Sequence, residues 1–218
     1  MKKIILIAGG IILSAASFAQ LRLGVQVTSN LASANVKSKY DIDFNKSLAS
    51  LPGVSVVVQY DLGRHLSLRS GVTYLKQGVK LKHAEDEFGS TTTTTRLNYL
   101  QVPVHVIYNV NVGGTRLYAG LGGYGAYGIS GEVKNTLWFY TDDGGYDFTE
   151  KLKAFKKSEE DGGNFQRKDY GLSALAGVQL RNGLFIQAGY QQGLTNISRD
   201  KEDRYRNKGA QLSIGYFF

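Results

Sequence analysis

Eight segments of this chain alternate apolar and polar residues with a period of two. That period places successive side chains on opposite faces of a β-strand, whereas a helix would need a period near 3.6. The alternation is clearest in residues 21–28, 54–62, 66–74, 100–109, 117–129, 170–180, 184–191 and 210–218. With their flanking residues they predict eight strands of ten or more residues, and a tilted strand needs about 9 to 11 to cross a bilayer.

The alternation changes phase at two places. Leu97 and Tyr99 are one step out of register with Leu100, and Val79 and Leu81 are out of register with the apolar residues before them. We interpret both changes as β-bulges or as strand ends that lie beyond the membrane.

The connections between the segments alternate in length. Short ones lie at 63–65, 111–114 and 182–183, and long ones at 32–52, 83–95, 132–168 and 195–207. Asn182-Gly183 is the dipeptide that two-residue hairpin turns prefer. This order predicts an all-β fold, an eight-stranded antiparallel transmembrane barrel with short periplasmic turns, long extracellular loops and both termini on the periplasmic side.

The two faces of the strands indicate which side meets lipid. A soluble lipocalin-like barrel would carry many charges on its polar face, but here that face is mainly Ser, Thr, Gln, Gly and Asn. A small uncharged polar face suits the crowded interior of an eight-stranded barrel, so the apolar face should point to lipid. Aromatic residues gather near both ends of that face as two girdles: Tyr60, Tyr108, Tyr216 and Phe218 at one end, and Tyr74, Tyr127, Tyr170 and Tyr190 at the other.

The first residues have the pattern of a cleaved export signal. Lys2 and Lys3 precede an apolar stretch at 4–13, and Ser17 and Ala19 occupy the small-residue positions of a cleavage site. We expect a signal peptide at 1–19 and a barrel domain at 20–218.

Composition excludes several classes of protein. The chain has 27 glycines without a three-residue period and no cysteine, which excludes collagen, disulfides and thiolate metal sites. The net charge is +8, but residues 132–168 mix seven basic with eight acidic residues. We interpret that stretch as a solvated loop and expect no nucleic-acid binding.

Three stretches resemble one known family. Residues 211–218 end in an aromatic residue like the sorting signal of outer-membrane barrels, and residues 97–104 and 183–190, with the Ala19-Gln20 junction, resemble the PorT-like outer-membrane β-barrel family of Gram-negative bacteria. The resemblance implies an outer-membrane barrel. It also implies a link to protein secretion or another envelope function, because some members of that family serve a secretion machinery.

The motifs for catalysis and cofactor binding are weak. Residues 120–125 satisfy G-x-G-x-x-G, but no helix pattern follows, so we interpret these glycines as room for large interior neighbours such as Tyr118 and Tyr124. Residues 41–45 resemble the start of a calcium loop, yet Lys46 stands at the glycine position. His83 with Glu85 or Asp86 and Ser90 could be drawn as a catalytic set, although nothing in the spacing favours it. We expect no enzyme activity, cofactor or metal.

The interior should hold a polar network near the short turns. Across the turn at 63–65, Gln59 lies opposite Arg69 and Asp61 is its diagonal neighbour, so Asp61 is the expected counter-ion. Arg22 on an adjacent strand should join this network, and we assign the inward-pointing His105 to it as well. Phe218 and Tyr216 form the expected assembly signal at the chain end.

The longest connection contains a cluster of aromatic residues. Trp138, Phe139 and Tyr140 face Tyr146 and Phe148 across Asp142–Gly145, which predicts a β-ribbon with an aromatic face. These residues could bind a protein or glycan partner, or pack on one another to order the loop. The threonine run at 91–95 should extend the second long connection as another ribbon.

Three functions remain open from the sequence. We expect a non-enzymatic, monomeric barrel that meets lipid, passes through the barrel-assembly machinery and presents a binding surface. The alternatives are a narrow channel, which eight strands disfavour, and a lipid-modifying enzyme.

Overall fold

The computed structural model describes residues 20–37, 45–47, 49–85, 89–141, 144–156, 165–200 and 203–218. The expected signal peptide at 1–19 lies outside the described residues, and so does most of the calcium-like stretch at 41–45. The strands are β1 Leu21–Lys37, β2 Asn45–Ser47, β3 Ala49–Asp61, β4 Leu66–Glu85, β5 Gly89–Val112, β6 Thr115–Thr141, β7 Gly144–Lys153, β8 Lys168–Gln179, β9 Leu184–Gly193 and β10 Arg204–Phe217.

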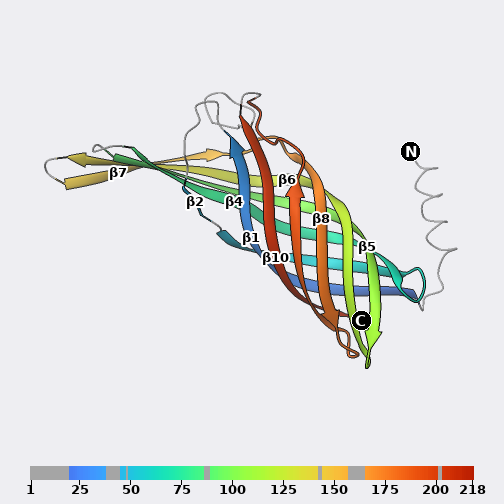
Figure 1. Ribbon diagram of the computed structural model, residues 1–218. Helices are drawn as coiled ribbons and strands as arrows, with labels where there is room; N and C mark the ends of the chain where they lie inside the picture. The colour runs from blue at the N-terminus through green and yellow to red at the C-terminus, as the bar shows by residue number, and fades with distance from the viewer. Residues whose placement is uncertain are drawn as a thin grey trace, which may run out of the picture.

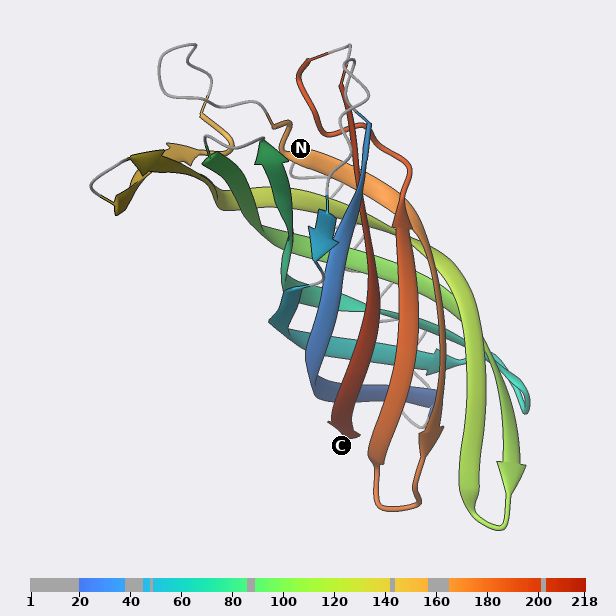
Figure 2. The same ribbon diagram turned by 60° about the vertical axis from the view of Figure 1, so that its left-hand side comes forward.

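Eight of these strands close into an antiparallel ring (Figures 1 and 2). The ring runs β1-β3-β4-β5-β6-β8-β9-β10, and β10 returns to β1, where Val25 lies opposite Tyr216. This confirms the predicted eight-stranded all-β barrel. Within the described residues, no helix is long and apolar enough to cross a membrane.

The barrel is apolar outside and largely polar inside, as the alternation predicted. Its exposed side chains include Val25, Val56, Val72, Val104, Leu121, Leu172, Ile186 and Ile214, together with the girdle residues Tyr74, Tyr108, Tyr127, Tyr170, Tyr190, Tyr216 and Phe218. Gln59, Arg69, His105 and Asn109 are buried on the opposite face. Val104 therefore lies on the lipid side.

The short connections are tight hairpin turns. Gly113 and Gly114 both have positive φ, at 56° and 87°, as a two-residue turn of the favoured type needs. At Asn182-Gly183 the turn is wider than predicted, because the Gly183 N–H donates to the Leu180 carbonyl at 3.1 Å before β9 begins. Gly183 has φ 90°.

Two of the predicted long connections, 83–95 and 132–168, proved to be largely strand. β4 and β5 stay paired as far as Glu85 opposite Gly89, and β6 pairs with β5 and β7 along its outer half. Pairing satisfies the backbone groups beyond the membrane, and the threonine run has strong strand preference. We call this extension the wing: residues 78–85 of β4, 89–96 of β5, 131–141 of β6, and β7. Figure 1 shows it leaving the barrel to one side.

The two phase changes mark where the interior becomes apolar. A register shift lies at Asn98/Tyr99, but Leu97, Tyr99 and Gln101 all point inward along β5, so the inward alternation of that strand is unbroken. Leu97 and Tyr99 instead join a buried apolar cluster at the long-loop end, which we call the plug. Its members are Ala34, Val79, Leu81, Leu97, Tyr99, Ala154, Phe155, Phe165, Ile197 and Tyr205.

Candidate functional site: a filled lumen and a projecting wing

The interior polar network begins at the short-turn end with Asp61. Its carboxylate accepts from Arg22 at 3.0 Å and from Arg116 at 3.3 Å. Gln59 and Ser67 donate to the same carboxylate at 3.1 and 2.6 Å. Barrel closure makes this cluster, because Arg22 comes from β1 and Arg116 from β6.

Arg69 lies deeper and has different partners from those predicted. It stands opposite Gln59 as the register predicted, and its Nε donates to the Gln59 side chain at 2.8 Å. Its second donor goes to Gln187 of β9 at 2.7 Å rather than to Asp61, so the expected Asp61–Arg69 ion pair is wrong. Asp61 already lies between two other arginines, and Gln187 reaches Arg69 from across the lumen.

Aromatic rings complete the surroundings of Arg69. The guanidinium carbon lies 4.5 Å from the Tyr118 centroid, 5.3 Å from that of Phe217 and 5.6 Å from that of Phe185. A desolvated cation over ring faces gains electrostatic attraction that partly replaces its lost hydration. Tyr118 was expected inside the barrel, whereas Phe185 and Phe217 were not singled out, because they occur on an otherwise polar face.

His105 lies opposite Arg69 in the strand register. Its Nε2 is 2.8 Å from the Ser173 hydroxyl of β8. His105 therefore belongs to the same interior layer as Arg69, but its hydrogen bond passes over Gly122 of β6 to the next strand, β8.

A small cavity lies between this layer and the plug. It has a volume of about 50 Å³ and is lined by Arg69, His105, Gln101, Gln187 and Gln191 among others. That volume suits a few water molecules and no larger solute.

The plug closes the long-loop end of the lumen. Tyr99 is fully buried and meets the Phe155 ring edge-on with 6.0 Å between centroids. Beneath it Asp169, 1% exposed, accepts from Asn207 at 2.9 Å and from Tyr124 at 3.5 Å. Neither Asp169 nor Asn207 was singled out from the sequence, because each occurs alone at a strand end.

The glycine motif at 120–125 lies within β6, as the structural interpretation required. A Cβ on Gly120 would come within 2.3 Å of Ile107, and one on Gly122 would reach the backbone of β5. The rings of Tyr118 and Tyr124 cover Gly177 and Gly171 on β8. These glycines make room for interior side chains.

The aromatic residues of the wing do not share one face. Phe139 lies opposite Tyr146, with 5.6 Å between ring centroids, and Phe148 lies opposite Leu137. These residues continue the inner face of the barrel. Trp138 alternates to the outer face, where its ring covers Gly145. The side chain of Tyr140 is outside the described side chains, so the single aromatic face predicted for the set is wrong.

The inner aromatics of the wing are only partly covered by one another. Tyr146 is 59% exposed and Phe148 57% exposed. We call Phe139, Tyr146 and Phe148 the aromatic tip.

The outer face of the wing carries lysines. Lys134 of β6 lies directly opposite Lys151 of β7, and Lys80 of β4 lies in the same cross-strand row. The interpretation of 132–168 as a mixed, solvated loop did not predict this patch, because it is strand pairing that brings Lys134, Lys151 and Lys80 into one row.

The chain end lies beside the first strand. The Phe218 N–H donates to the Leu23 carbonyl at 2.8 Å, and the Phe218 ring meets Tyr216 edge-on at 5.6 Å. Phe218 is 77% exposed. This position fits a girdle residue and leaves the expected assembly role a prediction.

The described side chains hold no group of three or more His, Asp or Glu that could bind a metal ion. The side chains of 83–89, which include most of the catalytic set considered above, lie outside those that the structure describes.

His65 of the short turn stacks on Tyr108 with 5.8 Å between centroids.

Comparison with known proteins agrees with the barrel. Residues 18–199 match the family described as outer membrane protein beta-barrel domain. A comparison with curated proteins finds no match.

Several solved outer-membrane proteins match this chain over most of its length. Ail, the attachment invasion locus protein of Yersinia pestis, shares 16% identity, with 90% of this chain and 99% of that one covered and a TM-score of 0.40. Neisserial surface protein A shares 17% identity over 90% and 97% of the two chains, with a TM-score of 0.41. The outer membrane protease OmpT of Escherichia coli shares 8% identity over 91% and 97%, with a TM-score of 0.31. With TM-scores below 0.5, these likenesses carry no further conclusion about the chain. On its family match, the chain belongs to the outer membrane protein β-barrel domain family and is a protein of the outer membrane.

Proposed function

We propose that this protein is a non-enzymatic, monomeric interaction barrel that uses the wing to bind a protein or glycan at the cell surface. The observation that carries the proposal is the exposed aromatic tip, held on paired strands well away from the barrel (Figure 1). Exposed tyrosine and phenylalanine side chains are typical of binding surfaces.

The filled lumen supports an interaction role over transport. At the short-turn end Arg22 and Arg116 both donate to Asp61 across the barrel, and Tyr118, Phe185 and Phe217 surround Arg69 above them. The plug fills the opposite end. A solute would have to displace both layers.

The strand pairing of the wing supports the same role. Strand pairing holds Phe139 and Tyr146 in fixed register, so the aromatic tip needs little ordering when a partner arrives. The resemblance to PorT-like proteins suggests the kind of partner: a component of a secretion or envelope assembly.

Shortening the hairpin tests this function. Asn135 lies opposite Glu150, so residues 136–149 can be replaced by Asn-Gly to close β6 and β7 without changing their register. Outer membranes are treated with a cross-linker, the tagged barrel is purified, and the proteins cross-linked to it are identified. We expect the full-length barrel to recover a discrete partner that the shortened barrel loses.

Point variants separate the aromatic side chains from the hairpin itself. Phe139→Ser, Tyr146→Ser and Phe148→Ser together should abolish recovery, while Thr136→Ser with Thr149→Ser on the outer face should not. A glycan array probed with the purified barrel tests for a carbohydrate partner. Unchanged recovery with the shortened hairpin, together with an array signal that does not depend on the tip, would refute the proposal.

A further inference from the structure

The outer face of the wing has a cross-strand row of three lysines and one threonine. Lys80 lies opposite Thr94, Thr94 opposite Lys134, and Lys134 opposite Lys151, so the row crosses β4, β5, β6 and β7. At about 4.8 Å between strands, the row is about 14 Å long. Four successive strands thus build one surface.

Neighbouring rows add more positive than negative charge. Arg96 and Lys153 flank Glu132 in the row nearer the barrel, and Lys82 of β4 points out farther along the wing. The acidic members on this face, among the described side chains, are Glu132 and Asp147. The face therefore has six basic groups against two acidic ones.

The pairing of Lys134 with Lys151 is unfavourable without an anion. Like charges directly opposite each other on neighbouring strands repel. Within the described part of the chain, neither ammonium has a carboxylate at salt-bridge distance, whereas the arginines inside the barrel share Asp61. An anionic ligand that bridges the two lysines would remove this repulsion.

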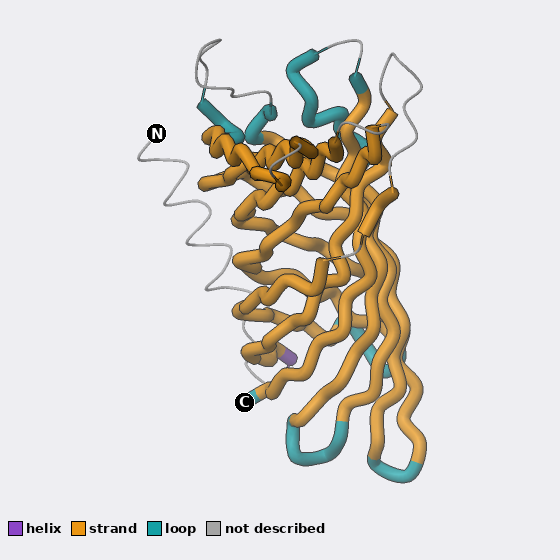
Figure 3. The backbone as a smooth tube through the Cα atoms, turned by 90° about the vertical axis from the view of Figure 1, so that its left-hand side faces the viewer, coloured by secondary structure: helices purple, strands orange, loops and turns teal. Residues whose placement is uncertain are grey.

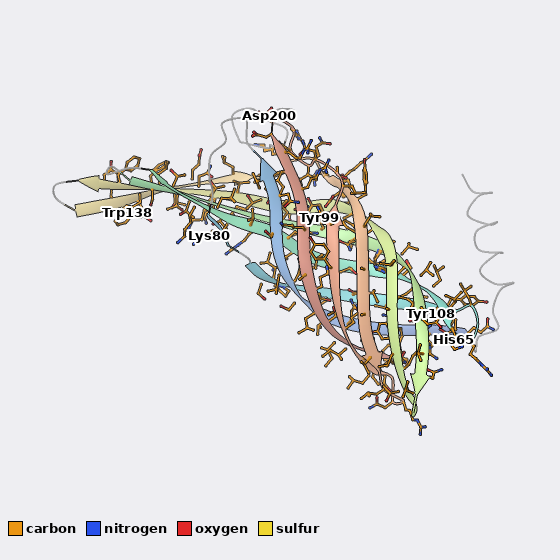
Figure 4. The ribbon with its side chains drawn as sticks, viewed as in Figure 1. His65, Lys80, Tyr99, Tyr108, Trp138 and Asp200 are labelled. Atoms are coloured by element: carbon orange, nitrogen blue, oxygen red, sulfur yellow. The ribbon has the colours of Figure 1, made fainter. Side chains whose placement is uncertain are left out.

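The basic face continues the lipid-facing surface of the barrel. Tyr74 in the girdle and Lys80 point to the same side of β4, six residues apart, which is about 20 Å along the strand. Figure 3 looks at the wing end-on and shows the barrel wall beneath it. Lys80 and Trp138, labelled in Figure 4, both lie on the lower side of the wing in that view. The wing thus overhangs the surface beside the barrel.

We propose that the outer face of the wing binds the phosphate groups of phosphorylated glycolipid in the outer leaflet. Two observations support this ligand. The opposed lysines favour an anion. The face that carries them continues the lipid-facing wall, which favours a lipid headgroup over a soluble protein. Trp138 lies at the far end of the same face, and tryptophan is enriched where membrane meets water. This contact is independent of the proposed function, which uses the opposite face.

Trp138 also provides the readout, because it is the only tryptophan in the chain. The barrel is reconstituted in nanodiscs of phosphatidylcholine alone, with lipopolysaccharide, with the same lipopolysaccharide after dephosphorylation, or with phosphatidylglycerol. We expect the phosphorylated glycolipid to shift Trp138 emission to shorter wavelength and to reduce its quenching by acrylamide. The effect should weaken as sodium chloride is raised, since added ions screen exposed charges.

Charge-matched variants identify the binding groups. Lys134→Gln with Lys151→Gln should weaken binding about 25-fold, since a basic residue near an anionic surface contributes about fivefold in affinity. Arg64→Gln with Arg181→Gln removes the same charge from the short turns and should leave binding unchanged.

Two results would overturn the proposal. Both are measured on the wild-type protein, so they need no folding control. A shift of Trp138 emission as large with dephosphorylated as with phosphorylated glycolipid would exclude phosphate recognition. An equal shift with phosphatidylglycerol would reduce the face to a general anionic-surface contact and exclude the glycolipid.

Discussion

Inside the barrel, near its short-turn end, the guanidinium of Arg69 lies over the ring of Tyr118, 4.5 Å from its centroid. Arg69 is 3% exposed and bonds to two glutamine side chains on opposite walls. A buried cation without a carboxylate bonded to it is held by amide oxygens and ring faces. These bonds link β4 to β3 and, across the lumen, to β9, so the lumen is filled at this layer.

Replacing Arg69 by lysine should destabilise the barrel by about 2 kcal/mol. Lysine cannot present two donors in a planar fork to Gln59 and Gln187, and it stacks poorly on Tyr118. Unfolding by urea in lipid vesicles, followed by far-ultraviolet circular dichroism, measures the loss. Arg64→Lys in the exposed short turn is the control and should change the free energy of unfolding by less than about 0.5 kcal/mol.

The ion pairs of Asp61 should be measurable with double-mutant cycles. Asp61→Asn combined with Arg22→Gln should give a coupling of about 0.5–1 kcal/mol, because these side chains are 23% and 19% exposed and solvent screens them. The cycle of Asp61→Asn with Arg69→Gln should give a smaller coupling. A larger coupling of Asp61 with Arg69 than with Arg22 would mean that Asp61 is the counter-ion of Arg69.

Much of the barrel followed from the sequence, because period-two alternation directly reflects side chains that face lipid or lumen. Gln59, Asp61 and Arg69 could be grouped because one short turn fixes their register, and Arg22 was added from an adjacent strand. Arg116 and Gln187 could not, since only closure of the ring brings β6 and β9 to them. The ribbons at 91–95 and 138–148 were predicted, but their union into one wing and the plug were not, because beyond the membrane the lipid-facing requirement ends and alternation no longer marks the strands.

Arginine at a lipid-facing position should cost about 2–4 kcal/mol. Val104 is 47% exposed on the outer wall, and Val178 shares that face in part. Val104→Arg should therefore lower the free energy of unfolding by this amount in vesicles. Gln191→Asn on the inner wall is the comparison, and its cost should not vary with lipid chain length. Dependence on lipid thickness at Gln191 but not at Val104 would invert the assignment of faces.

The interior glycines should be intolerant of a methyl group. Gly122→Ala would place a Cβ against the backbone of β5 and should destabilise the barrel by about 1–3 kcal/mol. Gly125→Ala on the same strand meets nothing within 4 Å and should be neutral. Equal effects in urea unfolding would show that strand preference, rather than packing, governs this motif.

Deleting Phe218 should impair assembly more than stability. The folded barrel loses one backbone hydrogen bond, to Leu23, and a ring that is mostly exposed. Surface levels in cells should fall, while the purified variant should refold into detergent as the parent does. If surface levels stay normal, Phe218 acts with Tyr216 simply as a girdle residue.

The filled lumen predicts an electrically silent barrel. Planar bilayers that contain the purified protein should show no steady ohmic steps, because the central cavity is only about 50 Å³ and lies between two packed layers. Regular steps at low voltage would show that the plug or the Arg69 layer opens.

Photo-cross-linking in cells tests the central claim most directly, that the inner face of the wing is a binding surface. A photoreactive residue is placed at Phe148 on the inner face, or at the adjacent Thr149 on the outer face. We predict one discrete cross-linked species from position 148 that is absent from position 149. The same species from both positions, or from neither, would contradict the account.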